Sequence, residues 1–454
     1  MRPHVEEFDA EDNEEIVERV AAIDVAKASG TVCTRVPHAS IPKRRVTRVW
    51  GVPATTNAIL TLADELIAAG VERVVVESTS DYWRAFVYLF ESAGLTTWLV
   101  NAHDVKQVPG RPKTDRVDAV WLAKLNERGM LRPSFIPPGE IRRLRDYTRL
   151  RSDLTEERSR HKQRVEKLLE DALIKLSTVA TDIFGVSGRA MMDALIDGER
   201  DAVTLAKLAK GRLRPKHPEL VQALNGRFDD HHAELARVLL DQVDSLTAKI
   251  DVLTSRIDDL IAKIPAAALP TTATPITDNP QDPASPSDPA TPLPAIARLD
   301  EIPGVGLRAA QTIIAEIGLD MRQFPTANHL VSWAKLSPRT IQSGPKSRGG
   351  KTGKGNRYLK AVLGEVAVAA AKTDTFLGAR YRRLVRRSGK QKALVAVARS
   401  ILVVVWHLLN DPTARFNDLG SKYYDEHFNN DRKTRQLVQQ LRALGHDVAL
   451  TPAA

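Results

Sequence analysis

The stretch ERVVVESTSDYWRAFVYLFESAG, residues 72–94, decides the fold of the first part of the chain. Its first seven residues are rich in β-branched valine and predict a strand. From Asp81 onward apolar residues recur at helical spacing, and Gly94 is a typical helix stop. A strand followed at once by an amphipathic helix is the building unit of an α/β layer fold.

The same alternation extends over residues 22–130. The segment NAILTLADELIAAG, residues 57–70, has helical spacing and also ends in glycine. Three more strand-like runs flank these helices: AAIDVA at 21–26, RVTRVWGV at 45–52 and TTWLVNA at 96–102. We therefore predict one α/β domain with a partly parallel sheet for residues 22–130.

The charge of the chain is distributed unevenly. The formal net charge is +10, but residues 1–22 carry −6, so the remainder is near +16. We expect residues 1–21 to be a disordered acidic extension. The basic remainder favours a polyanionic partner.

Compartment and membrane signals are weak. The only cysteine is Cys33, which excludes an internal disulfide and fits a reducing compartment. The N-terminus is acidic, unlike a secretion signal. The apolar run 393–409 is interrupted by Arg399 and His407 and is short for a bilayer, so we interpret it as a buried helix. These features predict a cytoplasmic protein without a membrane span.

A proline-rich segment divides the rest of the chain. Residues 265–297 hold nine of the 26 prolines and no lysine or arginine, which predicts an extended linker. Before it, residues 131–264 are helical, and two heptad rows end there: Leu239, Leu246, Leu253 and Leu260, with Val243, Ile250, Ile257 and Ile264. They predict a coiled-coil seam, within or between subunits; the alternative is one amphipathic helix packed on its own domain. After it, residues 298–410 indicate a mostly α domain, and 411–454 a polar tail with a helix near 434–444.

Four acidic residues have the pattern of a metal site. Asp24 lies within an apolar strand, and Glu77 ends another, where open α/β sheets place their sites. Asp115 and Asp118 lie one turn apart at a predicted helix start. Gathered carboxylates need cations, and their hard oxygens suit Mg²⁺ or Mn²⁺. Taken singly, each acid has an ordinary structural explanation, such as a helix N-terminus.

The second domain begins with a glycine turn between apolar helices, LDEIPGVGLRAAQTIIAEIG at 299–318. Gly304 and Gly306 would let backbone amides approach a phosphate, as in a helix-hairpin-helix that grips DNA. A plain pair of packed helices is the alternative.

A basic, glycine-rich segment follows, LSPRTIQSGPKSRGGKTGKGNRYLK at 336–360. No acid occurs between Asp320 and Glu365, and a run of cations with glycines suits phosphate tracking. The predicted DNA-binding residues here are Arg339, Lys346, Arg348, Lys351, Lys354 and Arg357. Ser343 among these cations could attack phosphorus, although spacing alone does not favour it over Ser337 or Ser347.

These blocks resemble the insertion-sequence transposases that have a DEDD, RuvC-like domain and a serine-containing C-terminal domain. The resemblance rests on AIDVAK, VVVES, KTDRVDA, EIPGVG and the serine segment, in that order. It covers roughly residues 22–130 and 298–410. The long proline-rich linker and the acidic extension depart from the family's pattern without touching these motifs.

The resemblance implies an RNase H-like first domain whose metal-binding set is Asp24, Glu77, Asp115 and Asp118. It implies that Ser343, which precedes a glycine, forms a transient covalent link to DNA. It further implies a guide (bridge) RNA, DNA ends and targets as substrates, a homodimer or homotetramer, and association with the nucleoid.

Two other functions remain open at this point. A metal-dependent junction-resolving endonuclease would use the acidic set and the DNA grip, with water as its nucleophile. A non-catalytic architectural protein would need only the hairpin and the basic run, and gathered carboxylates that repel phosphate argue against it.

Overall fold

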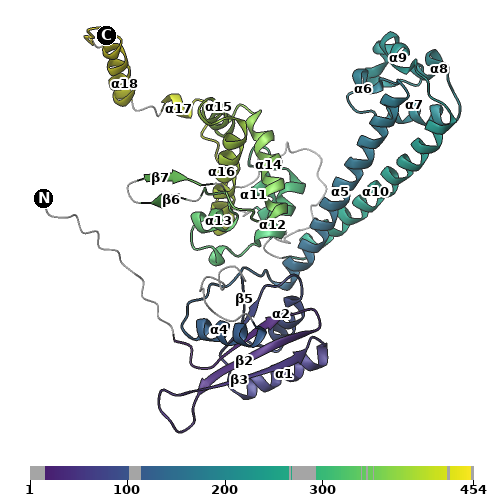
Figure 1. The fold of residues 1–454 in the computed structure, drawn as a ribbon. Helices are drawn as coiled ribbons and strands as arrows, with labels where there is room; N and C mark the ends of the chain where they lie inside the picture. Colours follow the sequence, from purple (N-terminus) through teal and green to yellow (C-terminus); the bar gives the residue numbers. More distant parts are fainter. Residues whose placement is uncertain are drawn as a thin grey trace, which may run out of the picture. The chain divides into compact units, whose positions relative to one another are not determined.

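The computed structural model describes residues 16–101, 114–264, 267, 293–338, 340–343, 346–350, 352–426 and 430–450 (Figure 1). The acidic segment 1–15 and most of the proline-rich segment lie outside this range. The chain divides into two compact units, residues 1–136 and 137–454. Each unit is described by itself.

The first unit is a mixed five-stranded sheet with the order β3-β2-β1-β4-β5. β1 is antiparallel to β2, β2 is antiparallel to β3, and β4 is parallel to both β1 and β5. The strands are β1 (Val20–Val25), β2 (Ser29–Pro37), β3 (Arg45–Pro53), β4 (Arg73–Glu77) and β5 (Thr97–Val100). This mixed sheet, covered by helices, fits the RNase H-like domain that the family resemblance implies.

Helices cover both faces of the sheet because successive strand residues point to opposite sides. α1 (Thr56–Ala68) and α2 (Trp83–Ser92) pack on one face, where Ile23 and Val76 are buried. α4 (Asp115–Glu127) packs on the other, against Ala22 and Val75. The predicted helix stops are confirmed, since Gly70 and Gly94 adopt φ of +66° and +81° just after α1 and α2.

Two features of this unit were not expected from the sequence. β2 was missed, because its buried positions include the small or polar residues Cys33 and Thr34 in place of a valine run. Burial also raises the pKa of Cys33 to about 11, so its thiol stays protonated and inert at neutral pH.

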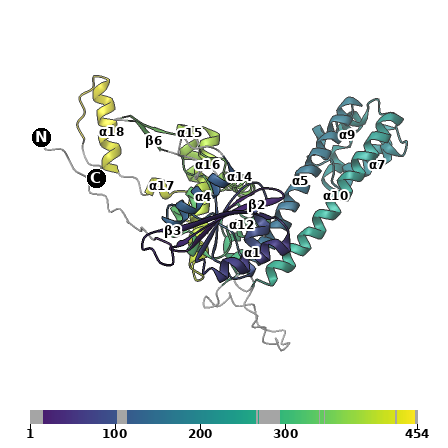
Figure 2. The ribbon, with the colours of Figure 1, turned by 60° about the horizontal axis from the view of Figure 1, so that its bottom comes forward.

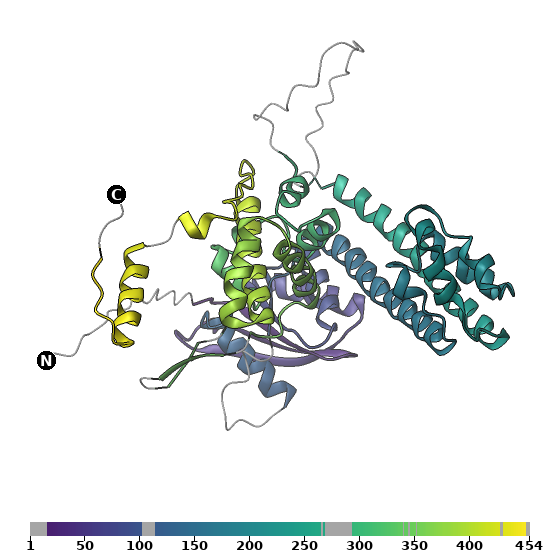
Figure 3. The ribbon, with the colours of Figure 1, turned by 90° about the horizontal axis from the view of Figure 1, so that it is seen from above.

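In the second unit, α5 (Gly139–Asp171) and α10 (Asp230–Ala262) run side by side and antiparallel (Figures 1 and 3). Arg158 of α5 donates to Thr247 of α10, and Asp171 at the end of α5 meets His232 at the start of α10. Both predicted heptad rows of α10 are buried or half-buried. Because α5 of the same chain is their packing partner, these rows give no independent sign of a second subunit.

A group of short helices packs at one end of this pair around Met191, Leu195 and Leu220 (Figure 2). They are α6 (Leu176–Val179), α7 (Val186–Ile196), α8 (Ala202–Ala206) and α9 (His217–Leu224).

The remaining elements up to α16 belong to the predicted helical domain, with one short β-ribbon, and the last two lie in the predicted tail. They are α11 (Ala295–Asp300), α12 (Leu307–Ile317), α13 (Ala327–Trp333), β6 (Thr340–Ser343), β7 (Lys346–Gly349), α14 (Arg357–Ala371), α15 (Phe376–Ser388), α16 (Lys390–Asn410), α17 (Tyr423–Glu426) and α18 (Asn430–Ala443). Among the described helices, α16 alone is long and apolar enough to cross a membrane by length and composition. It packs on α13, α14 and α15, and Trp406 donates to the Phe324 carbonyl, as in a core helix.

Candidate functional site

The register of β1 and β4 brings two of the predicted carboxylates together. Ile23 pairs with Val76, so Asp24 and Glu77 are the next residues along two parallel neighbouring strands. Ala22 and Val75 belong to the face that α4 covers, and side chains alternate, so Asp24 and Glu77 belong to that face as well. Glu77 is only 6% exposed, whereas Asp24 is half-buried.

A buried asparagine fixes the direction of α4. Asn126, near its C-terminus, donates from Nδ2 to the carbonyls of Ala21 and Arg73 at 3.1 and 3.2 Å. Its Oδ1 accepts from Arg73 Nε at 2.7 Å. Because Ala21 and Arg73 lie at the amino ends of their strands, α4 runs antiparallel to β1 and β4.

Asp118 therefore lies toward the carboxyl ends of these strands. From Asn126 back to Asp118 the helix rises about 12 Å, and from Ala21 to Asp24 the strand advances about 10 Å. Thr114 caps α4 by accepting from the amide of Val117, which places Asp115 and Asp118 in the first turn. Asp118 is half-buried and Asp115 is exposed.

Asp24 and Glu77 thus occupy neighbouring positions, and the start of α4, with Asp115 and Asp118, lies toward the same end of the sheet. Within the residues that the structure describes, however, no three acidic, histidine or cysteine side chains are close enough to hold a metal ion. The carboxylate oxygens are suitable donors for Mg²⁺ or Mn²⁺. The position fits the predicted site, and the four acids remain a proposed ligand set.

The two glycines of the turn in the second unit, Gly304 and Gly306, have different surroundings. Gly304 has φ of +88°, and a Cβ there would lie 2.7 Å from the Val366 carbonyl, so this glycine is needed for packing on α14. Gly306 precedes α12, and a Cβ there would have no neighbour within 4 Å. Gly306 thus has open space around its α-carbon at the start of α12, where a phosphate could approach the backbone.

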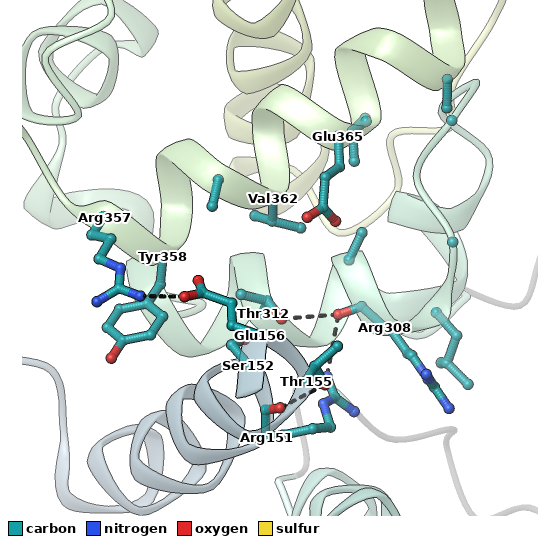
Figure 4. A pocket seen from close by; sticks show the side chains of 17 residues that line it. Arg151, Ser152, Thr155, Glu156, Arg308, Thr312, Arg357, Tyr358, Val362 and Glu365 are labelled. Carbon is teal, nitrogen blue, oxygen red and sulfur yellow. Dashed lines mark hydrogen bonds and ion pairs between the residues drawn. The ribbon is translucent and has the colours of Figure 1, made fainter. Parts of the chain in front are cut away.

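A cavity of about 700 Å³ lies beside this turn, between α5, α12 and α14 (Figure 4). Arg308 and Leu307 at the start of α12 line it together with Arg151 of α5. Arg151 is buried and donates to Gln311 Oε1 at 2.7 Å. Burial, together with Arg308, lowers the pKa of Arg151 to about 10 despite Asp258, so it stays charged at neutral pH.

Arg357, predicted to bind DNA, lines the same cavity with a local partner. Its Nη2 lies 2.8 Å from Glu156 Oε2 (Figure 4). The same nitrogen lies 3.8 Å from Asp153 Oδ1. The hydrogen bond to Glu156 raises the pKa of Arg357. A phosphate at this position would have to replace a carboxylate that is already in place.

A buried glutamate, not anticipated from the sequence, joins α5 to the second domain. Glu316 on α12 is fully buried and pairs with Arg149, with both oxygens at 2.8 Å. Asn356 donates to it at 2.5 Å, and Arg145 Nε lies 3.5 Å away. Burial alone would lower the pKa of Arg149, but Glu316 outweighs it and the pKa is raised.

The serine segment forms a β-ribbon where the sequence suggested a loop. Ser343 is the last residue of β6 and pairs with Lys346, and Ile341 pairs with Arg348. Paired positions of an antiparallel ladder share a face, so the positions of Ser343, Lys346 and Arg348 belong to one face and that of Ser347 to the other. Arg339, Gly344 and Lys351 lie outside the described residues, and Lys354 is exposed.

Two family models match the chain. One, described as a transposase and built on DEDD transposases of IS110, matches residues 21–174. The other, described as the transposase IS116/IS110/IS902 family, matches residues 296–382. The first begins one residue before the predicted α/β domain and continues through α5, and the second covers the glycine turn, the ribbon and α14.

One curated relative and one solved structure are similar to parts of the chain. The insertion element IS110 uncharacterized 43.6 kDa protein of Streptomyces coelicolor is 36% identical over 117 residues. That match covers 25% of this chain and 29% of the relative. The RuvC structure of Thermus thermophilus covers 26% of this chain and 99% of its own, with a TM-score of 0.21 and 13% identity.

Proposed function

We propose that this chain, in which residues 21–174 and 296–382 are IS110-family transposase domains, is the DNA transposase of an insertion sequence. It cuts and rejoins DNA with the acids of the first unit and a serine of the second. The observation that supports this proposal is the parallel register of β1 and β4, which makes Asp24 and Glu77 neighbours, with the start of α4 toward the same end of the sheet.

The acidic set would hold a divalent metal. Asp24, Glu77, Asp115 and Asp118 would supply hard oxygen ligands to Mg²⁺ or Mn²⁺. When bound, such ions neutralise charge and stabilise the attacking and leaving oxygens of a phosphodiester. The chain contributes a preset geometry, because strands fix Asp24 and Glu77 while the capped start of α4 fixes the other two.

Ser343 would be the nucleophile. Its place at the end of β6, on the ribbon face that includes the positions of Lys346 and Arg348, supports it over Ser347. Cations near a serine oxygen favour its alkoxide and the charged transition state. Attack on phosphorus would form a phosphoserine ester with DNA and release a 3′- or 5′-hydroxyl, and the reverse step would rejoin a strand.

The DNA grip would consist of the open start of α12 at Gly306, with Gly304 shaping the turn, and the cations of the ribbon and the loop after it. Arg339, Lys346, Arg348, Lys351 and Lys354 are its proposed phosphate contacts, and Arg357 would join them only by leaving Glu156. Contacts of this kind position DNA without reading its sequence.

We expect Arg348→Ala and Lys354→Ala each to weaken DNA binding and to lower the slope of log affinity against log salt by about one. Fluorescence anisotropy across a salt series measures both. Arg322→Ala is the matched control, because this exposed arginine is already neutralised by Asp320 at 2.7 Å. An unchanged slope in both ribbon and loop variants would show that this segment does not touch phosphates.

The family resemblance supplies the proposed partners. They are a guide RNA, further copies of the chain as a homodimer or homotetramer, and the DNA of element ends and targets. The heptads of α10 pack on α5, so a subunit contact would use another surface, and any coiled coil would be the intramolecular α5–α10 pair. A DNA transposase is expected in the cytoplasm at the nucleoid.

A reconstituted recombination assay tests the proposed function. The purified protein is mixed with Mg²⁺, plasmids carrying the element junction and a target, and RNA transcribed from the element's flanks. The expected result is a recombinant junction that depends on both metal and protein. A folded protein that binds this DNA but yields neither cut nor joined strands would contradict the proposal.

A further inference from the structure

A second cationic cavity lies on α15, apart from the glycine turn and the ribbon. It encloses about 270 Å³ and is lined by Arg380, Arg383, Leu384, Arg387 and Tyr424. The arginines recur at spacings of three and four residues, so they share one face of the helix. Since a water occupies about 30 Å³, the cavity has room for a phosphate group.

The walls of this cavity are held in place by aromatic contacts. Phe376, at the start of α15, stacks on Tyr424 of α17 at 5.3 Å, and Tyr423 meets it edge-on at 5.1 Å. The amide of Phe376 also donates to Asp418 at 3.0 Å. The short helix α17 is thereby fixed beside the arginine face.

Two of the arginines are oriented by Tyr424. Arg380 Nη1 donates to the Tyr424 hydroxyl at 3.0 Å, and the Arg383 guanidinium lies 4.6 Å from the centre of its ring. Stacking on an aromatic ring leaves the edge of a guanidinium available to bind an anion. Arg380 and Arg383 are therefore held in a defined orientation at the cavity.

The arginines around the cavity lack local partners for part of their donors and charge. Arg380 Nε is buried and has no hydrogen-bond partner within the described part of the chain. A buried donor without a partner is unfavourable. No acid occurs between Asp374 and Asp411, while this stretch holds eight lysines and arginines. In the described side chains no carboxylate pairs with Arg383 or Arg387, so their mutual repulsion is not relieved locally.

We infer that the cavity formed by Arg380, Arg383, Arg387 and Tyr424 binds a backbone phosphate of nucleic acid. The forks of Arg383 and Arg387 would bind the phosphate oxygens, with Arg380 held beside them by Tyr424. This inference rests on the proposed function. It adds a second site that holds nucleic acid, on α15, the helix that follows α14. DNA and RNA offer the same phosphodiester, so the test separates them.

The test measures binding by the full-length protein to fluorescent oligonucleotides of one sequence, as duplex DNA, single-stranded DNA and single-stranded RNA. The pocket variant is Arg383→Ala with Arg387→Ala. Its matched control is Arg382→Ala with Arg386→Ala, which removes the same charge from the same helix but from residues that do not line the cavity. Arg382 pairs with Asp374 at 3.4 Å.

The pocket variant is expected to lose about tenfold or more in affinity for at least one nucleic acid, with a salt slope lower by about one. The control should change less than about threefold, as loss of unspecific surface charge does. The arm with the larger loss identifies the nucleic acid. Equal losses of affinity in the pocket variant and the control would overturn the inference. They would show that the positive charge of the helix surface attracts nucleic acid without a specific site.

Lysine substitutions at Arg383 and Arg387 provide a second readout, since lysine keeps the charge but lacks the fork. The lysine variant should still bind nucleic acid more weakly than wild type. In a separate measurement at constant ionic strength, inorganic phosphate should displace nucleic acid from the wild-type protein but not from the pocket variant. Full binding by the lysine variant would contradict the inference. If the wild-type protein bound none of the three nucleic acids, the proposed function itself would fail. If the wild-type protein recombined DNA and the pocket variant bound nucleic acid normally, only this inference would fail.

Discussion

Replacing Glu77 by glutamine is expected to abolish DNA strand cleavage while leaving the fold and DNA binding intact. The side chain keeps its size, so the buried position at the end of β4 stays filled. What is lost is a negative charge beside Asp24, on the face that α4 covers. Loss of a metal-binding charge should lower the cleavage rate by about a thousandfold or more, equivalent to roughly 4 kcal/mol of barrier.

Cleavage of labelled junction DNA, with circular dichroism and DNA retention measured on the same samples, checks this result. Asp24→Asn should behave in the same way. The matched control is Glu72→Gln, an exposed residue just before β4 whose side chain accepts from the Arg19 amide. Its activity should stay near wild type. Normal recombination by Glu77→Gln would remove the acidic set from the mechanism.

Replacing Glu316 by alanine is expected to destabilise the second unit by about 3–5 kcal/mol. Glu316 is fully buried, and its removal leaves Arg149, Arg145 and Asn356 without their shared acceptor. The penalty comes from two half-buried guanidinium groups, those of Arg149 and Arg145, that lose their carboxylate. Since these partners lie on α5 and at the start of α14, α5 should loosen from α12.

Hydrogen exchange of α12 and α14 amides, together with urea unfolding, measures this loss. Glu316→Gln keeps one oxygen acceptor and should fall between wild type and alanine. Glu301→Gln is the control, because its pair with Arg415 is at the surface, and it should cost about 1 kcal/mol or less. Protection of α12 as in wild type would mean that the pair does not hold α5 to the domain.

The sequence predicted the elements whose signals are local. The apolar runs of β1 and β4, the glycines after α1 and α2, and the start of α4 follow from neighbouring residues, so four of the five strands of the sheet could be anticipated. The heptads predicted the buried face of α10, although only the structure identifies α5 as its partner.

Features that depend on distant residues could not be anticipated. Glu316 in the sequence looks like an ordinary helix acid, and its partner Arg149 is 167 residues away in a helix whose charges suggest a solvated surface. Gly304 and Gly306 look alike in PGVG, and only the approach of α14 to Gly304 separates their roles. The arginine cavity required Tyr424, which lies beyond α16 in the chain.

The most direct test of the central claim is to trap the bond between protein and DNA. Labelled junction DNA is incubated with wild type or Ser343→Ala in the presence of Mg²⁺ and flanking RNA, denatured, and analysed for a protein–DNA adduct, with peptide mapping of the linked residue. The account predicts an adduct on Ser343 in wild type and none in the variant. Metal-dependent cleavage without an adduct in both proteins would contradict it and indicate a nuclease that uses water.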